Sequence, residues 1–110
     1  MDLINYDTFK KAELIIVTIN HAEKIDGSDK LLRLLVNDGT EKERQIIAGI
    51  GKSYTPENLI GKQIAIVANL EPRTLMCHES QGMVLAGHGE DNSAVLLFPE
   101  KTVPAGSIIS

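Results

Sequence analysis

Several features are scarce or missing in this 110-residue chain, and each absence excludes a class of protein. Cys77 is the only cysteine, so no internal disulfide can form, and the sequence shows neither a basic-then-apolar leader nor an apolar run of membrane length. These absences predict a protein of the reducing cytoplasm. We also find no internal repeat and no low-complexity tract. A composition of 43% hydrophobic and 24% charged residues predicts one globular domain over residues 1–110.

An excess of positive charge is missing as well. The formal net charge is −4, whereas proteins that coat nucleic acid through bulk charge carry a basic footprint. Any contact with nucleic acid must therefore be local. All basic residues except Lys101 lie between Lys10 and Arg73, which allows a basic patch on one face but equally an ordinary mixed surface. Because so small a domain buries a low fraction of its surface, association with a second copy is also expected.

Alternating and β-branched runs dominate what is present and predict an all-β protein. Strands are expected at residues 13–21, 31–37, 44–50, 63–69 and 82–86, with a further short strand at 94–98. Residues 23–29 and 87–92 are expected to be a loop and a turn, and Asp38-Gly39 is a hairpin signal.

Helix signals are few. Asn5 can cap a short helix over residues 5–9, in which Phe9 is expected to pack inward. Thr55-Pro56-Glu57 predicts a second helix that ends at Gly61 within about two turns. The resulting order places the internal helix between strands three and four, as in a five-stranded OB-fold Greek-key barrel, although the pattern also allows other small barrels. The tail is expected to form a C-terminal β extension.

Four sequence strings now become informative together. They are SDKLL at 28–32, ERQIIAGIGKSYTPENLIGK at 43–62, VANLEP at 67–72 and ESQGMVLAG at 79–87. In order and spacing they resemble the tRNA-binding domain found at the C-terminus of many methionyl-tRNA synthetases, in free-standing dimeric tRNA-binding proteins, and in related cytokine-like and export-chaperone proteins.

The resemblance implies an OB barrel that dimerises through its terminal segments and grips the outer corner of tRNA, selecting shape more than sequence. It implies no chemistry and no cofactor. Such a module raises the local concentration of tRNA near a synthetase, the usual gain from a tethered second binding site. An export-chaperone-like dimer that binds proteins on the same scaffold is the alternative.

The candidate RNA-binding residues fall into three chemical groups. Cations can neutralise phosphates, polar side chains can bond a phosphate, ribose or base edge, and a methionine can lie against a base. These candidates are Lys30, Arg33, Arg44, Lys52, Lys62 and Arg73; Asn69, Ser80 and Gln81; and Met83. Each cation could instead be a solvated surface charge, Asn69 and Gln81 could be turn residues, and Met83 could be a core residue.

The chain also departs from the family pattern. It has Ile15-Ile16-Val17 where Arg-Val-Gly is usual, Glu71 where lysine is frequent, and Cys77 or His78 where glycine is common. Two cations are thus lost and one anion is gained, which predicts weaker electrostatic binding or a changed RNA role.

Signals for other chemistries are weak. Cys77, His78 and His88 lack the paired spacing of a structural zinc site, and Ser80 is not in a Gly-x-Ser-x-Gly elbow. The Gly87-His88-Gly89 turn lacks the Lys-Ser/Thr ending of a phosphate-binding loop. We therefore expect neither a metal site nor an enzyme.

Overall fold

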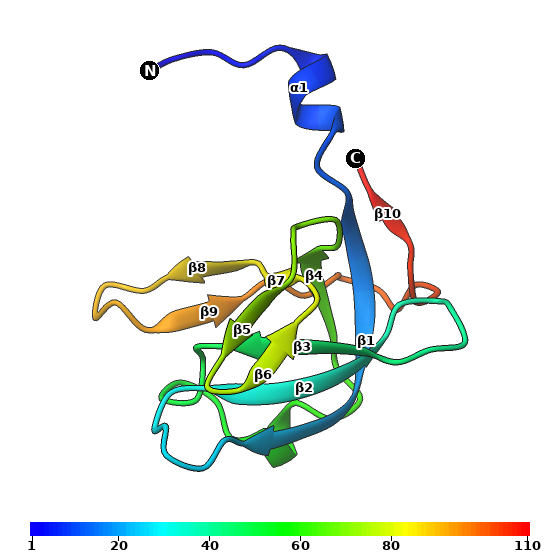
Figure 1. Ribbon diagram of the computed structural model, residues 1–110. Helices are drawn as coiled ribbons and strands as arrows, with labels where there is room; N and C mark the ends of the chain where they lie inside the picture. The colour runs from blue at the N-terminus through cyan, green and yellow to red at the C-terminus, as the bar shows by residue number, and fades with distance from the viewer.

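The computed structural model describes residues 1–110, and its centre is a strongly bent antiparallel sheet. The sheet order is β3-β2-β1-β4-β7, with bounds Arg44–Ala48, Leu32–Asn37, Leu14–Lys24, Gln63–Val67 and Met83–Val84. The first half of β1 pairs with β4 and its second half with β2, with a register shift between Ile19 and His21. This shift lets one long strand bend around the core (Figure 1).

The two edges of the sheet approach each other and nearly close a barrel. The Gln81 N–H, just before β7, donates to the Gln45 carbonyl of β3 at 2.8 Å. The Ile47 N–H of β3 donates to Ser80 Oγ at 2.9 Å. A nearly closed five-strand barrel with this connectivity confirms the OB-like fold that the strand order predicted.

The barrel core follows directly from the alternating pattern. Leu32, Leu34 and Val36 of β2 all point inward and are at most 1% exposed. Facing strands supply the rest of the cluster, including Val17, Ile19, Ile46, Ile64 and Ile66. One face of each of these strands is therefore fixed by burial of apolar surface.

The predicted helix between strands three and four is shorter than expected. Only a 3-10 turn, η1, forms over Pro56–Asn58, and Thr55 makes no side-chain cap. Leu59 directly after it is fully buried in the core, and Gly61 then adopts a φ of 88°. With Leu59 anchored so soon after Pro56, the chain has no length for a second turn.

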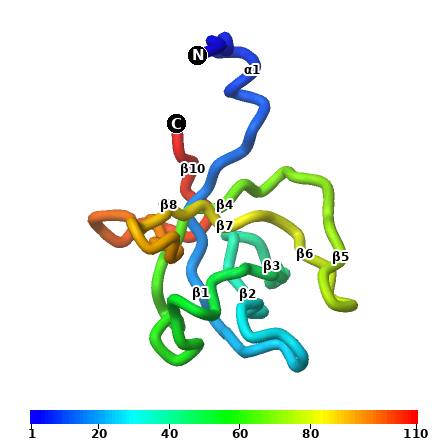
Figure 2. The backbone as a smooth tube through the Cα atoms, turned by 90° about the vertical axis from the view of Figure 1, so that its left-hand side faces the viewer, coloured from blue at the N-terminus to red at the C-terminus, as the bar shows by residue number.

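The sequence predicted no strand between residues 69 and 82 and one strand over 82–86, but the structure differs from both expectations. After Pro72 the chain forms a hairpin of β5, Arg73–Leu75, and β6, His78–Ser80. The predicted strand over 82–86 divides into β7 and β8, Ala86–His88, and β8 pairs with β9, Ala94–Leu96. In Figure 2 the β5–β6 and β8–β9 hairpins lie on opposite sides of the barrel.

The terminal segments lie together at one end of the molecule (Figure 1). Helix α1, Tyr6–Lys10, is capped as predicted, since Asn5 Oδ1 accepts from the Thr8 N–H at 2.8 Å. The inward packing expected of Phe9 is wrong: the residue is 42% exposed because α1 stands off the barrel. Strand β10, Ile108–Ile109, pairs with the start of β1 and forms the expected C-terminal β extension.

Two glycines hold the C-terminal segment against the β2–β3 turn. Gly39 and Gly106 both have φ near 90°, and a Cβ on Gly106 would lie 2.5 Å from the Asp38 carbonyl oxygen. Only glycine permits this close approach of two backbones. No helix in the structure has the length and apolarity needed to cross a membrane.

Candidate nucleic-acid interface

One groove on the barrel brings several of the predicted site residues together. It has a volume of about 400 Å³ and lies between β3, the β4–β5 loop, the β5–β6 hairpin and β7. We call it the Lys30–Arg73 groove; its lining comprises Lys30, Leu31, Ile47, Ala48, Gly49, Ile50, Leu70, Glu71, Arg73, Leu75, Ser80, Gly82, Met83, Val84 and Ala86. Lys30, Arg73, Ser80 and Met83 were predicted from the sequence.

The charged side chains of this groove have no partner within the protein. Lys30, Glu71 and Arg73 line it, and none of them takes part in any of the four ion pairs of the chain. The backbone beneath Lys30 is held firmly, because its carbonyl accepts from the Gly51 N–H at 2.7 Å. The groove thus presents two cations and one anion whose charges are free to meet a ligand.

Met83 lies in the groove rather than in the core. The residue is 46% exposed, whereas the next residue, Val84, packs against the barrel core. A core position for Met83 would follow if one regular strand ran through Met83 and Leu85, but regular pairing is interrupted between β7 and β8. A thioether is therefore available at the groove surface.

Ser80 reaches the groove but uses its hydroxyl inside the protein. The residue is only 5% exposed. Its Oγ accepts from the Ile47 N–H at 2.9 Å and donates to the Gly82 carbonyl at 3.0 Å. Ser80 thereby joins the two edges of the barrel and shapes the groove wall.

Asn69 faces away from the groove, toward the N-terminal segment. Its Oδ1 accepts from the Glu13 N–H at 2.8 Å and its Nδ2 donates to the Lys11 carbonyl at 2.7 Å. The following residue, Leu70, does line the groove. The amide therefore ties the segment after α1 to the end of β4, which also orients the β4–β5 loop.

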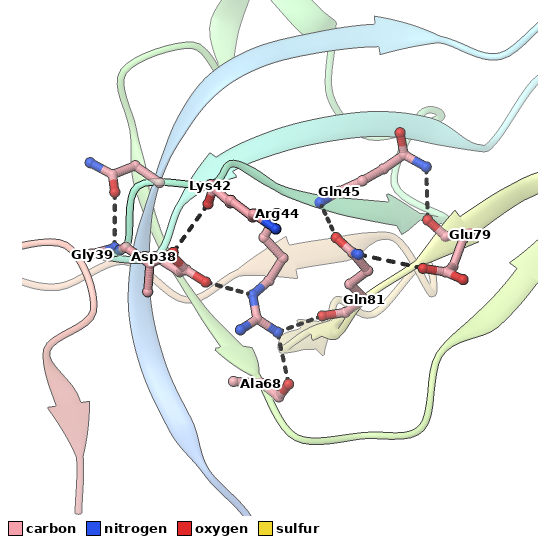
Figure 3. A network of polar contacts seen from close by, with 10 residues as sticks. Asp38, Gly39, Lys42, Arg44, Gln45, Ala68, Glu79 and Gln81 are labelled. Atoms are coloured by element: carbon pink, nitrogen blue, oxygen red, sulfur yellow. Dashed lines mark hydrogen bonds and ion pairs between the residues drawn. The ribbon is translucent and has the colours of Figure 1, made fainter.

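Arg44 is the centre of a polar clamp outside the groove (Figure 3). Its Nε donates to Asp38 Oδ2 at 3.0 Å, and one terminal nitrogen donates to the carbonyls of Ala68 and Gln81 at 2.8 and 2.7 Å. Burial raises the pKa of Asp38, but hydrogen bonds from Thr40 and Arg44 outweigh it, so this pKa lies below its ordinary value. The guanidinium fastens β3 to the end of β4 and to the residue before Gly82.

Gln81 and Gln45 continue this clamp along β3 (Figure 3). Gln81 Oε1 accepts from the Gln45 N–H at 2.9 Å, and Gln45 Nε2 donates to the Glu79 carbonyl at 2.8 Å. Arg33 joins the same network: its Nε donates to Gln45 Oε1 at 2.7 Å. These side chains hold the β6 segment against β3 and so fix one wall of the groove.

The other predicted cations lie outside the groove and have partners of their own. Arg33 also donates to Glu23 Oε1 at 2.6 Å, and this hydrogen bond is the main reason that the pKa of Glu23 is lowered. Lys52 places its Nζ 3.7 Å from Asp29 Oδ2. Lys62 places its Nζ 5.2 Å from the Phe98 ring centroid.

Sequence reasoning missed the apolar side chains of the groove and the placement of Glu71. Leu31 lies just before β2, whereas Leu70 lies in the β4–β5 loop and Leu75 in β5, so no periodicity within one strand marks all three as neighbours. The alternation of Glu71, Arg73 and Leu75 was the available signal, because alternate residues of an extended segment face the same side. It was hidden by Pro72, which reads as a strand break.

The family model described as "Putative tRNA binding domain" matches residues 14–108. This chain belongs to the tRNA-binding domain family.

Relatives of this family member include parts of much larger proteins. It is 52% identical over 104 residues to the methionine–tRNA ligase of Methanothrix thermoacetophila, covering 94% of this chain and 15% of that ligase. It is 50% identical over 110 residues to the methionine–tRNA ligase of Caldanaerobacter subterraneus, covering 100% of this chain and 17% of that ligase. The chain therefore spans about a sixth of the length of these ligases.

Solved structures of comparable length share the whole fold. The methionyl-tRNA-synthetase-related protein from Pyrococcus horikoshii superposes with a TM-score of 0.93 at 35% identity, covering 100% of both chains. The chaperone CsaA from Bacillus anthracis superposes with a TM-score of 0.89 at 36% identity, covering 99% of this chain and 100% of that one. The resemblance inferred from the sequence is thus confirmed at the level of the family.

Proposed function

We propose that this chain is a non-catalytic module that binds folded tRNA in the cytoplasm, selecting shape more than sequence. It acts as a homodimer of one-domain subunits or as an accessory part of methionyl-tRNA synthetase. Membership of the tRNA-binding domain family and the similarity to methionine–tRNA ligases support this proposal. Residues 1–110 form the one domain that the function requires.

The single observation that carries the proposal is the pair of unpartnered cations in the Lys30–Arg73 groove. Lys30 and Arg73 come from separate segments and meet on one surface, although the chain as a whole is anionic. Cations that meet phosphates release condensed counterions, which supplies much of the affinity for nucleic acid. Because only two such cations line the groove, binding is local and depends on the shape of the folded RNA.

A gel shift with total tRNA across a range of salt concentrations tests the proposal. The wild-type protein is expected to bind at low salt, and the double variant Lys30→Ala/Arg73→Ala to bind more weakly. Each lost phosphate contact also reduces the slope of log affinity against log salt concentration by about one. Absence of binding by the wild-type protein at low salt would contradict the proposal.

A matched control removes the same charge elsewhere. Lys24 and Lys101 are exposed and lie outside the groove. The double variant Lys24→Ala/Lys101→Ala therefore changes net charge equally but is expected to keep the wild-type salt slope. Equal losses in both double variants would mean that bulk charge, and not the groove, binds the RNA.

The homodimer part of the proposal rests on the terminal segments. Tyr6 and Phe9 of α1 and Ile108 of β10 expose apolar side chains beside a cavity of about 460 Å³. Burying this surface against a second copy would stabilise both chains. Sedimentation equilibrium should show a dimer for the wild-type protein and a monomer for the double variant Phe9→Asp/Ile108→Asp. A monomeric wild-type protein would contradict the homodimer proposal.

Binding of other proteins is a second candidate function, because the likeness to the chaperone CsaA covers 99% of this chain. Exposed Val95, Leu97 and Phe98 offer an apolar surface for such a partner. This function predicts that the RNA-free protein suppresses aggregation of a thermally unfolded client. An inert result in that assay, with tRNA binding retained, would decide for the RNA role.

A further inference from the structure

Glu71 is an acidic residue within the groove for which tRNA binding alone gives no reason. It lies in the Lys30–Arg73 groove, is exposed, and forms no ion pair with the neighbouring Arg73. Glu71, Arg73 and Leu75 alternate along one segment and all line the groove, so they form a column of an anion, a cation and an apolar side chain.

The chemistry of a carboxylate restricts what Glu71 can meet. An ionised carboxylate accepts hydrogen bonds and cannot donate them, and phosphate oxygens are acceptors as well. A phosphate beside Glu71 would therefore be repelled. The parts of RNA that can donate to two carboxylate oxygens are base edges carrying N–H groups, or a ribose hydroxyl.

The apolar groove surface favours a base over a ribose. Leu31, Leu70, Leu75 and Met83 line the groove around the three charged residues. Apolar side chains and a polarisable thioether suit the flat face of an unstacked base, whereas a sugar would leave that surface poorly covered. The volume of about 400 Å³ is within the range of roughly 300–1,000 Å³ that is usual for small-molecule sites.

We propose that the Lys30–Arg73 groove takes one unstacked guanine of the bound RNA and that Glu71 determines this choice. The two carboxylate oxygens accept from adjacent N–H groups on the Watson–Crick edge of guanine. Met83 and Leu70 cover the face of the base, and Lys30 and Arg73 meet the flanking phosphates. Adenine, cytosine and uracil each offer fewer adjacent N–H donors on that edge. The inference rests on the proposed RNA-binding function and adds a base preference to it.

Short single strands test this preference directly. Fluorescein-labelled pentaribonucleotides UUGUU, UUAUU, UUCUU and UUUUU differ at one base and cannot form a duplex. Anisotropy titrations with the full chain are expected to give the tightest binding for UUGUU, by about fivefold or more over the others, which is the usual effect of one good bidentate contact. Equal affinity for all four strands would overturn the proposal.

The variant Glu71→Gln has nearly the same shape but no charge and only one acceptor oxygen. It is expected to reduce the guanine preference to less than about twofold. Glu57→Gln, an exposed change outside the groove, removes the same charge and is expected to keep the full preference. If Glu71→Gln instead strengthened binding of all four strands equally, Glu71 would be a repulsive charge and no determinant of base choice.

Failure of this inference can be told apart from failure of the proposed function. Total tRNA that binds with a salt dependence carried by Lys30 and Arg73, while none of the four pentamers binds, would overturn only the base-reading role. If neither total tRNA nor any pentamer binds at low salt, both proposals are wrong.

Discussion

Arg44 and Arg73 both lie next to the β4–β5 loop, but their guanidinium groups behave in opposite ways. Arg44 forms three hydrogen bonds within the clamp, and its side chain is 23% exposed. Arg73 follows the β4–β5 loop, lines the groove and forms no ion pair. The same residue type therefore stabilises the protein at one position and stays available to a ligand at the other.

The difference arises from the acceptors that surround each guanidinium. Arg44 lies among the Asp38 carboxylate and two backbone carbonyls that have no other partner in the barrel ladder, so it satisfies three protein acceptors. Arg73 is exposed at the start of a short hairpin strand whose backbone bonds are made within the hairpin. A cation becomes a binding residue only where the fold has left it without an acceptor.

Removal of Arg44 should have the largest effect on stability. Arg44→Ala leaves Asp38 Oδ2 and two carbonyls without their donor, although Thr40 still donates to Asp38 Oδ1, and should lower the free energy of unfolding by about 3 kcal/mol. Urea denaturation measures this loss. Arg73→Ala is the matched control and should change stability by no more than about 0.5 kcal/mol. Similar losses of unfolding free energy in the two variants would contradict the different roles assigned to Arg44 and Arg73.

Ser80→Ala should have the second-largest effect on stability. Ser80 borders the groove, but its hydroxyl forms hydrogen bonds within the protein, as the Arg44 guanidinium does. The Ile47 N–H would lose its acceptor in a buried site, at a cost of about 2 kcal/mol. The salt slope of tRNA binding should stay at the wild-type value, since no phosphate contact is lost. A reduced slope in a fully folded Ser80→Ala protein would instead make Ser80 a direct RNA contact, as the sequence predicted.

Acidification should lower the free energy of unfolding through the clamp by less than Arg44→Ala does. The pKa of Asp38 is lowered in the folded protein, so its stabilising contribution is complete above its ordinary value of 3.8 and is lost as the pH falls through the lower folded value. The loss is smaller than in Arg44→Ala because Arg44 keeps its two carbonyl acceptors. Asp38→Asn should flatten this part of the stability profile below pH 3.8; an unchanged profile would contradict the prediction.

Asn69→Ala should have the smallest effect on global stability, about 1 kcal/mol or less, because both its hydrogen bonds lie at the surface. Its effect should be local. Hydrogen exchange of the Glu13 amide should become faster, while amides of the β1–β2 ladder keep their protection. Unchanged exchange at Glu13 would show that the N-terminal segment is held by other contacts.

The fold was predictable to the extent that it depends on alternation. The runs around Leu34, Ile46 and Ile66 each have one apolar face, and the structure buries those faces. Prediction failed where tertiary contacts replaced local signals. The early anchoring of Leu59 shortened the expected helix to η1, and the β5–β6 hairpin formed with non-glycine residues Met76 and Cys77 at positive φ.

The candidate site was predictable only in part. Lys30, Arg73, Ser80 and Met83 meet at one groove, whereas Arg33, Arg44, Asn69 and Gln81 bond within the protein and Lys52 lies apart with Asp29. Residue type and spacing indicate which side chains can bond RNA. They carry no information on whether an acceptor within the same protein reaches those side chains first.

By itself, the sequence determined the family, the strand pattern and the anionic balance. The alternation of apolar residues and the order of the motifs are both visible in the linear amino-acid sequence. Only the tertiary structure decided which charges remain free. Lys30 comes from a different segment than Glu71 and Arg73, and whether each meets a partner depends on distances that exist once the barrel has closed.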